Sequence, residues 1–492
     1  MTQFSTLLIG NETLTRQCGE VLLARGHRIA AVVTTAPDVR KWAEGRGLRV
    51  VAQAADLAGL SVDWLLSIAN LSVIPADVLA LAKGAVNFHD GPLPRYAGLN
   101  APVWAIWNGE AQHGISWHLI AGGVDEGDVL EQRLFDIAAD DTALTLNTRC
   151  FEAAMDSFPA LLAQLESGHL QRKPQDLTRR SLYLRADRPA AAGRLDFSEP
   201  ADVVARKVRA LDHGRYWNPL CTAKIATATQ VLNVGAAKVV AGNGAAGQVL
   251  RADDEGVVIA CGTGAVLLSR LTCQEKGLPV HPATVTGAVP PSITGAEALT
   301  AALAASVAHE AAQRKALGAM QPTVPVATTG QGEGWASVPL AGDLAHLALA
   351  YLRQSGAAHA DFAYGGISPA PGYLSHWVPL RVAELSIKLK SENDFRNAEG
   401  AARAASGFAL DLMSRDPALA GLQMPQVGLS RNGPVAGTVV TLGDTALHYD
   451  AAKITSSEAQ ALATRLASIA AQIAALPSDA DLAKVSALTQ TE

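Results

Sequence analysis

Two polar side chains, two positions apart, can do proton and hydrogen-bond chemistry in this sequence. They are Asn87 and His89, in the run Asn87-Phe88-His89-Asp90-Gly91-Pro92-Leu93-Pro94. On a strand, residues i and i+2 point to the same face, so both side chains can reach one substrate. A histidine can take up or release a proton near neutral pH. An asparagine amide can donate a hydrogen bond to an oxygen that becomes negative in a tetrahedral intermediate.

A carboxylate is needed to orient such a histidine or to balance its charge. Asp125 and Asp128 both lie in the glycine-flanked segment Gly122-Gly123-Val124-Asp125-Glu126-Gly127-Asp128, and spacing alone does not separate them. A lone histidine at a strand end, or an aspartate in a turn, is more often structural. The Asn-x-His pair is the feature that favours chemistry here.

The surrounding elements place this pair at a strand end. Strand-like apolar runs alternate with helical spacing, which predicts a parallel sheet with helices on both faces. Ligands of such folds bind beyond the carboxyl ends of the strands, where Asn87 and His89 lie. The expected strands are 4–9, 29–34, 50–51, 64–68, 85–89, 114–119 and 129–135, the expected helices are 12–25, 78–83 and 142–165, and the polar stretch 171–180 is interpreted as a linker.

The pattern changes after residue 200. Five short strands separated by Gly and Asn-Gly turns follow a helix at 203–211, and they predict a small β-barrel of the OB type. Residues 286–325 are interpreted as a linker that contains a helical stretch at 298–317. The third unit is expected to hold a helix at 344–352, strands ending at 382 and 442, and a last helix from Ser457, where Ser457 and Gln460 resemble a capping box.

Composition restricts the function classes. The chain has 492 residues, which predicts about three domains. Its formal net charge of −6 gives no support for nonspecific nucleic-acid binding. The five cysteines lie far apart without a Cys-x-x-Cys pair, which argues against a disulfide framework and a zinc site and favours the cytoplasm. No apolar run reaches the length of about 18 residues that a membrane span requires.

The motifs together resemble a known family. Asn87-Phe88-His89, Leu93-Pro94-Arg95, Gly98 and Asp125-Glu126-Gly127-Asp128 are similar to the motifs of the folate-dependent formyltransferases. The resemblance covers roughly residues 1–285. It implies a Rossmann-like parallel-sheet core over 1–180, a smaller subdomain over 200–285, and N10-formyltetrahydrofolate as the formyl donor, with no metal.

The resemblance also implies roles for individual residues. Asn87 would hold the formyl oxygen, His89 would accept or stabilise the proton, and Asp125 would support His89. The pterin would be held by backbone of two loops. The matching positions are Val86, Asp90 and Gly91 in the first loop and Ala121, Gly122, Gly123 and Val124 in the second. Tyr96 and Asn100 follow the first loop and either line the entrance for an amine substrate or are surface-turn residues.

Among the formyltransferases, the sequence looks most like the formylation domains of nonribosomal peptide synthetases. This resemblance rests on three segments, His89 to Asn100, Trp104 to Glu110 and His113 to His118. The methionyl-tRNA members carry a long basic loop after the second strand, whereas here residues 34–41 go straight into a helix. Together with the net charge of −6, this disfavours tRNA and predicts no nucleic-acid partner.

The third unit, 326–492, resembles the C-terminal half of a condensation domain, an α+β subdomain, followed by a linker toward an adenylation domain. The resemblance rests on Asp361 to Gly366, Trp377 to Val382, the helix at 457–476 and the closing segment 485–492. The His-His-x-x-x-Asp-Gly motif of condensation domains is missing, because no two of the 12 histidines are adjacent. This half is therefore expected to be a platform without condensation activity.

The resemblances predict a formyltransferase that acts on the α-amine of an aminoacyl group on a peptidyl carrier protein, with an adenylation domain as a further partner. They place the protein in peptide antibiotic or siderophore synthesis and imply no membrane partner. Two alternatives stay open at this point. The acceptor could be a nucleotide-linked amino sugar or a free amino acid, or the chain could be a non-catalytic scaffold that binds folate or a carrier protein.

Overall fold

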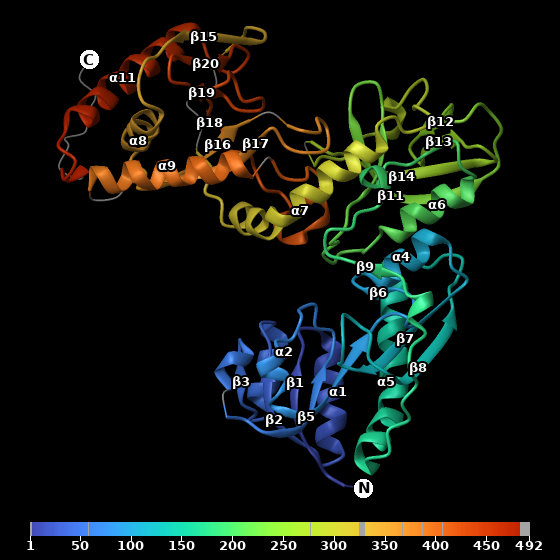
Figure 1. The fold of residues 1–492 in the computed structure, drawn as a ribbon. Coiled ribbons are helices and arrows are strands. Elements are labelled where there is room, and N and C mark those ends of the chain that lie inside the picture. The colour runs from blue at the N-terminus through green and yellow to red at the C-terminus, as the bar shows by residue number, and fades with distance from the viewer. Residues whose placement is uncertain are drawn as a thin grey trace.

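The computed structural model describes residues 2–57, 59–275, 277–323, 330–366, 368–384, 387–405 and 407–482. Three sheets with their covering helices follow one another along the chain, and the sheet nearest the N-terminus lies far from the C-terminal unit (Figure 1). The predicted closing segment 485–492 lies outside the described residues. The predicted division of the chain into four segments stays a prediction.

The first sheet has seven strands in the order β3-β2-β1-β4-β5-β7-β8. β1 to β5 run parallel, as predicted, but β5 pairs with β7 and β7 with β8 in the antiparallel sense, so the sheet is mixed. The strands are β1 Ser5–Ile9, β2 Arg28–Val33, β3 Val50–Val51, β4 Val62–Ser67, β5 Ala82–His89, β7 Gln112–Leu119 and β8 Val129–Asp136.

Helices cover both faces of this sheet, because consecutive strand residues such as Leu7 and Leu8 point to opposite sides. Leu8 packs in one core with α1 and α5, whereas Leu7 packs in another with the short helices η1 and α3. The predicted helix at 78–83 is shorter than expected, since Ala82 already belongs to β5. The helices are α1 Thr13–Ala24, α2 Pro37–Gly45, η1 Ala54–Leu57, α3 Ala76–Leu79, α4 Ala101–Asn108 and α5 Ala143–Ser167.

The second sheet contains the five strands that the sequence predicts, in the order β10-β11-β14-β13-β12. It is an open antiparallel sheet: in the described part of the chain, the edge strands β10 and β12 do not pair with each other. The predicted barrel is wrong in this respect, because closure requires the two edge strands to pair with each other. α6 (Ala201–Ala210) packs on β11 and β14. The strands are β10 Ala223–Ala226, β11 Val231–Val240, β12 Val249–Asp253, β13 Gly256–Ala260 and β14 Ala265–Cys273.

Small elements join the first two sheets. The core around α4, α6 and the second sheet is continuous, with Trp104, Phe197 and Val204 among its members. β6 (Ala97–Gly98) pairs with β9 (Leu182–Tyr183), which brings the segment after α5 back beside the turn that follows His89. The remaining elements of this part are η2 Leu177–Arg179, η3 Ala190–Gly193 and η4 Pro282–Thr284.

The third sheet has six strands in the order β15-β20-β19-β18-β16-β17 and is also mixed. α8 packs against α11, and α9 packs on β17. The elements are α7 Ala296–Gly318, β15 Trp335–Pro339, α8 Leu344–Ser355, β16 His359–Gly365, β17 Trp377–Ala383, α9 Lys388–Ala404, α10 Leu412–Arg415, η5 Pro417–Leu419, β18 Val427–Leu429, β19 Val440–Leu442, β20 Ala446–Asp450 and α11 Ser456–Ala475.

The last helix begins differently from the prediction. The capping box is formed by Thr455 and Glu458, not by Ser457 and Gln460. Thr455 Oγ1 accepts a hydrogen bond from the Glu458 N–H, and Glu458 Oε2 accepts one from the Thr455 N–H. Both positions satisfy the spacing of the motif, but only Thr455 precedes the first helical turn. Among the described residues, no helix is both long and apolar enough to cross a membrane.

Candidate active site

Asn87 and His118 form the first pair of the site. β5 carries Asn87, and the antiparallel pairing of β5 with β7 puts His118 directly opposite. Asn87 Nδ2 lies 3.2 Å from His118 Nε2, and His118 Nδ1 lies 2.9 Å from the carbonyl oxygen of Leu119. The Asn87 amide carries two hydrogens, and His118 Nε2 can bind at most one of them, so the other stays available for a ligand.

Asp125 completes the cluster from the loop between β7 and β8. Its Oδ2 lies 3.6 Å from His89 Nδ1, and its Oδ1 lies 3.3 Å from His118 Nε2. The Gly98 N–H donates to Oδ2 at 2.8 Å. Asp125 has a φ of 56°, a left-handed conformation that is uncommon for residues other than glycine. The structure therefore brings together Asn87, His89 and Asp125 as the sequence predicts.

Asp128, the alternative carboxylate, lies outside this cluster. Its Oδ2 is 3.7 Å from the Arg172 Nε, and both side chains are partly exposed. The choice between the two aspartates, which spacing left open, is thus made by geometry. Asp125 is the one that faces both histidines.

The contacts of His89 identify its proton-accepting atom. The ring is buried, with 4% of the side chain exposed. Nε2 lies 2.7 Å from the carbonyl oxygen of Tyr96, so this nitrogen carries the hydrogen and donates it. Nδ1 then holds the free lone pair, and it faces Asp125 and, at 3.9 Å, Asp90. A proton taken up at Nδ1 would be stabilised by these carboxylates.

The turn after His89 is held by several side chains. Ser116 Oγ donates to the Gly91 carbonyl and accepts from the Leu93 N–H. His113 donates through Nε2 to the Asp90 carbonyl at 2.8 Å. A Cβ on Gly91 would lie 2.6 Å from His89 Nε2, so only glycine lets this turn approach the imidazole. The turn thereby fixes the ring of His89.

Burial and hydrogen bonding set the charges of the neighbouring groups. Burial alone would raise the pKa of Asp125, but the hydrogen bond from His118, the nearby His89 and the Gly98 N–H outweigh it and lower the pKa to about 2. Burial raises the pKa of Asp90, in spite of the nearby His89. Burial also lowers the pKa of His113 to about 4, so this ring is neutral at pH 7. Asp125 is the fixed negative charge of the site.

The two predicted pterin loops lie beside the cluster. The Val86 side chain is buried in the core, and its backbone is paired with Leu119. Asp90 and Gly91 form the turn described above. Ala121, Gly122, Gly123 and Val124 are exposed, and the Gly123 N–H already donates to Glu126 Oε2 at 2.9 Å. Binding of the pterin by these loops stays a prediction.

One of the two predicted entrance residues differs from expectation. The Tyr96 side chain is 3% exposed, its hydroxyl donates to Glu110 Oε1, and its ring stacks on that of Tyr183. It therefore does not line an open entrance, and its contribution to the site is the carbonyl that binds His89. Asn100 precedes α4 in a left-handed conformation with a φ of 61°. A role of Asn100 toward a substrate stays a prediction.

The polar stretch 171–180, interpreted above as a linker, belongs to the site. Gln175 Nε2 donates to the carbonyl oxygens of Asp125 and Gly127, at 2.8 and 2.6 Å. Arg180 Nη2 donates to the Val124 carbonyl at 2.6 Å. The interpretation as a linker is therefore wrong. These side chains hold the loop that carries Asp125, and composition alone gives no sign of it.

His118 is the functional residue that the sequence reasoning missed. Its signal was present, because it follows Ser116 by two positions on an expected strand, and both side chains face the turn and the cluster. Only the antiparallel pairing of β5 with β7 puts it opposite Asn87. In the described part of the chain, no group of three or more His, Cys, Asp or Glu side chains could hold a metal ion.

Two family models match this chain. Residues 15–162 match the formyl transferase model, and residues 189–280 match the model of the formyl transferase C-terminal domain. A methionyl-tRNA formyltransferase of Pseudomonas syringae pv. syringae (strain B728a) is 33% identical over 225 residues, which are 46% of this chain and 69% of that protein. The chain belongs to the formyl transferase family. A methionyl-tRNA formyltransferase of Citrifermentans bemidjiense is 27% identical over 299 residues, 56% of this chain and 91% of that protein.

Two solved structures are similar to this chain at low identity. HypX from Aquifex aeolicus in complex with tetrahydrofolic acid has 22% identity and a TM-score of 0.43, with coverage of 58% of this chain and 47% of that one. The N-formyltransferase from Helicobacter canadensis, in complex with folinic acid and dTDP-3-aminofucose, has 16% identity and a TM-score of 0.44, with coverage of 55% and 100%.

Membership of the family confirms the predicted chemistry. The protein is a folate-dependent formyltransferase whose formyl donor is N10-formyltetrahydrofolate. The residues present fit that donor, because Asn87 has an amide hydrogen left for a carbonyl oxygen and His89 has a free Nδ1 beside it.

Proposed function

We propose that this formyl transferase moves the formyl group of N10-formyltetrahydrofolate to the α-amine of an aminoacyl group carried by a peptidyl carrier protein. The product would start a nonribosomal peptide. The chemistry rests on the cluster of Asn87, His89, His118 and Asp125. The choice of acceptor rests on the surface beside that cluster, which is described below.

The cluster supplies each function that formyl transfer needs. The amine nitrogen bonds to the formyl carbon, the bond from that carbon to N10 breaks, and one proton moves from the amine to N10. Asn87 donates its remaining amide hydrogen to the formyl oxygen as that oxygen becomes negative. His89 Nδ1 accepts the proton of the amine and releases it to the leaving nitrogen. Asp125 balances the charge of His89 in between.

The surface beside the cluster carries the proposal of a protein-borne acceptor. Arg172, Lys173, Arg179 and Arg185 are exposed on the segment that follows α5, in a chain whose net charge is −6. The same segment exposes Leu177 and Leu184, with 47% and 53% of their surface accessible. We name these six residues the docking segment. Exposed leucines among cations favour an acidic protein surface with apolar contacts over a phosphate backbone alone.

The docking segment lies against the loops of the site. Lys173 pairs with Val129 at the start of β8, and β9 of the same segment pairs with β6. Arg185 Nη2 donates to the Leu71 carbonyl at 3.3 Å. A partner bound to the docking segment is therefore close enough to present a flexible arm to His89.

The connection between β2 and α2 also supports a carrier over tRNA. β2 ends at Val33 and α2 begins at Pro37, so three residues join them. No basic loop is inserted at this connection. The third unit would serve as a platform between the formyltransferase and an adenylation domain. The likeness of the third unit to a condensation domain stays a prediction. The location of the protein in the cytoplasm also stays a prediction.

One assay with four acceptors tests the proposal. The protein would be given N10-formyltetrahydrofolate with a valyl-loaded carrier protein, initiator methionyl-tRNA, a nucleotide-linked amino sugar or free valine, and formyl products would be measured by mass spectrometry. We expect a product on the carrier. Transfer only to tRNA, to the sugar or to the free amino acid would overturn the acceptor. Folate binding without transfer to any of them would favour a scaffold.

A charge-reversal variant tests the docking segment separately. Arg179→Glu combined with Arg185→Glu should raise KM for the loaded carrier several-fold, because reversed rim charges slow association. The kcat/KM for a valyl-pantetheine thioester without the protein should not change. Arg465→Glu, which changes an exposed arginine of α11, is the matched control. Equal loss on both substrates would contradict a docking role.

A further inference from the structure

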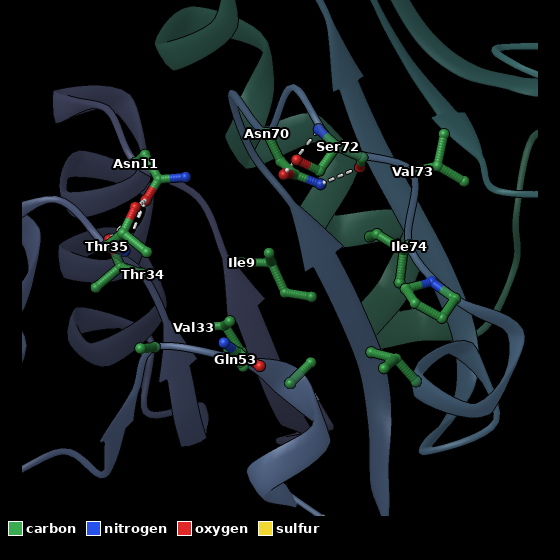
Figure 2. Close-up of a pocket in the computed structure, with 14 residues that line it drawn as sticks. Ile9, Asn11, Val33, Thr34, Thr35, Gln53, Asn70, Ser72, Val73 and Ile74 are labelled. Carbon is green, nitrogen blue, oxygen red and sulfur yellow. Dashed lines mark hydrogen bonds between the residues drawn. The ribbon is translucent and has the colours of Figure 1, made fainter. Parts of the chain in front are cut away.

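A pocket that lies outside the catalytic cluster is found beyond the ends of β1, β2, β3 and β4. Its volume is about 230 Å³. Figure 2 shows Ile9 and Val33 at its floor, Asn11, Thr34 and Thr35 on one side, and Asn70, Ser72, Val73 and Ile74 on the other. The pocket therefore lies between the loop after β1 and the loop after β4.

The lining is neutral throughout. Aliphatic side chains such as Ile9, Val33 and Ile74 form the apolar part, and amides and hydroxyls form the rim. No acidic or basic residue is among the described residues that line it. Asn11 is fixed there, because its Oδ1 accepts from the Thr35 N–H at 2.8 Å and from both threonine hydroxyls. Such a lining favours a neutral ligand with an apolar body.

The charges next to the pocket disfavour a phosphate group. Glu12 lies at the N-terminal end of α1, and Asp38 lies in the first turn of α2. Desolvation and the neighbouring Asp38 both raise the pKa of Glu12, which indicates that the two carboxylates repel each other. A phosphate would meet that repulsion. A nucleotide-linked acceptor is therefore a poor fit for this position.

The pocket is linked to the catalytic cluster through the end of β4. Ser67 ends β4 and pairs with Asn87 on β5. Asn70, which lines the pocket, donates through Nδ2 to Ser67 Oγ at 3.4 Å and to the Ser72 carbonyl at 2.8 Å. One side chain thus connects the wall of the pocket to the strand position beside Asn87. A substituent on the carbon next to the attacking amine can reach the pocket from there.

We propose that this pocket binds the side chain of the aminoacyl acceptor and selects neutral side chains. The inference rests on the proposed function, because it assumes an acceptor with an α-amine and a side chain. It adds a binding site with a defined ligand class. It also assigns the specificity of the reaction to the loops after β1 and β4.

A filling variant tests the pocket. Ser72→Trp keeps the backbone contacts of Ser72 with Asn70 and places a large ring at the rim. It should lower kcat/KM for valyl-loaded carrier by roughly 10–200-fold. It should leave glycyl-loaded carrier unchanged, because glycine has no side chain to place in the pocket. Ser61→Trp, the same change at an exposed position before β4, is the matched control.

A charge variant tests the selection of neutral side chains. Asn11→Asp has the same shape and keeps the oxygen that accepts from Thr34 and Thr35, but it adds a negative charge. It should raise the ratio of ornithyl- to valyl-carrier formylation about tenfold, through attraction of the cationic side chain.

The outcomes separate the pocket from the proposed function. Equal effects of Ser72→Trp on valyl and glycyl carriers, or an unchanged preference among aminoacyl groups in both variants, would overturn the proposed role of the pocket. The proposed function would not be affected. If the wild-type protein formylates no carrier at all, the proposed function itself fails. A wild-type protein that prefers acidic or cationic aminoacyl groups over neutral ones would also overturn the pocket.

Discussion

Two aspartates of this formyl transferase have different kinds of partner. The first contacts two cations, and the second contacts two histidines. Asp411 lies 2.6 Å from Lys224 Nζ and 3.0 Å from Arg415 Nε, and all three side chains are 1% exposed. Asp125 faces the two histidines of the catalytic cluster and is 11% exposed. Burial alone would raise the pKa of both carboxyls, but the neighbouring groups hold both pKa values well below the usual range.

The partners of the two carboxylates decide what each can do. Asp411, with Lys224 and Arg415, joins α10 to the second sheet, and Arg415 also binds Glu310 of α7. Both partners of Asp411 are cations, and the two ion pairs hold them against this carboxylate. The partners of Asp125 are histidines, a residue type that can take up and release protons in catalysis. The same residue type is thus structural at one place and suited to catalysis at the other.

Asp125→Asn tests the catalytic role of the aspartate that faces the two histidines. The amide keeps the size of the side chain but removes the charge that balances His89. We expect kcat for formyl transfer to fall by about 10²–10⁴-fold. The free energy of unfolding should also fall, because the folded state stabilises the charged form of Asp125. Steady-state kinetics on the folded variant, with urea unfolding in parallel, separate the two effects. Asp128→Asn, in the same loop, is the control and should keep its activity.

Asp411→Ala tests the structural role of the aspartate that contacts two cations. Lys224 and Arg415 would remain buried without their carboxylate, which costs about 3–5 kcal/mol when one partner of a buried pair is removed. We expect the urea midpoint to fall, whereas kcat of the protein that remains folded should not change. Asp254→Ala, at a side chain that is 95% exposed, should shift stability by no more than about 0.5 kcal/mol. Unchanged stability of Asp411→Ala would contradict the structural role of the network.

The dependence of stability on pH sharpens the comparison. Burial lowers the pKa of His113 and His213 to about 4 each, whereas the pKa in an unfolded chain is about 6.5. Between these values the unfolded chain binds more protons. Each histidine therefore adds stability above pH 6.5, and this contribution is lost as the pH falls toward 4, with a limit of about 1.4 kcal/mol per pH unit for each residue.

Both aspartates stay ionised in that window, so neither contributes to the loss, and the raised pKa of Asp90 acts in the opposite direction. Urea midpoints from pH 4.5 to 7.5 measure the slope. His213→Gln should lower the slope by up to about 1.4 kcal/mol per pH unit, since one of the two histidines is removed. A wild-type protein whose stability rises as the pH falls through this window would contradict the assignment.

Gln175→Ala tests how the loop of Asp125 is held. The change removes two hydrogen bonds to backbone carbonyls, each of which contributes about 0.5–1.5 kcal/mol. We expect a several-fold fall of kcat, smaller than that of Asp125→Asn, because the loop keeps Arg180. Gln171→Ala, four residues earlier and exposed, is the control. Equal effects of both variants would show that Gln175 does not position Asp125.

The sequence was sufficient where function depends on near neighbours. The pairing of Asn87 with His89, and their place at a strand end, follow from a spacing of two residues. The proximity of Asp125 came from the resemblance to the family, and the geometry then separated it from Asp128. Five strands were predicted for the second sheet from their turns. Local periodicity carries this information because each strand shows it within its own residues.

The features that the sequence did not predict depend on contacts between segments that are distant in the chain. His118 faces Asn87 only because β7 runs antiparallel to β5. Gln175 binds a loop about 50 residues earlier through backbone carbonyls, and no side-chain pattern marks an acceptor of that kind. Asp411 and Lys224 are separated by 187 residues. Whether the second sheet closes depends on pairing between its edge strands β10 and β12, which are not neighbours in the sequence.

The central claim is that the Asn87, His89 and Asp125 cluster formylates an amine on a carrier protein. The most direct measurement compares wild-type protein with His89→Ala in the transfer of formyl from N10-formyltetrahydrofolate to a valyl-loaded carrier, with the urea midpoint of each measured in parallel. We expect a formylated carrier with the wild-type protein, and a rate lower by about 10²–10⁴-fold with folded His89→Ala, whose midpoint should also fall because a buried ring and its hydrogen bond to the Tyr96 carbonyl are lost. Transfer by His89→Ala at the wild-type rate would contradict the account.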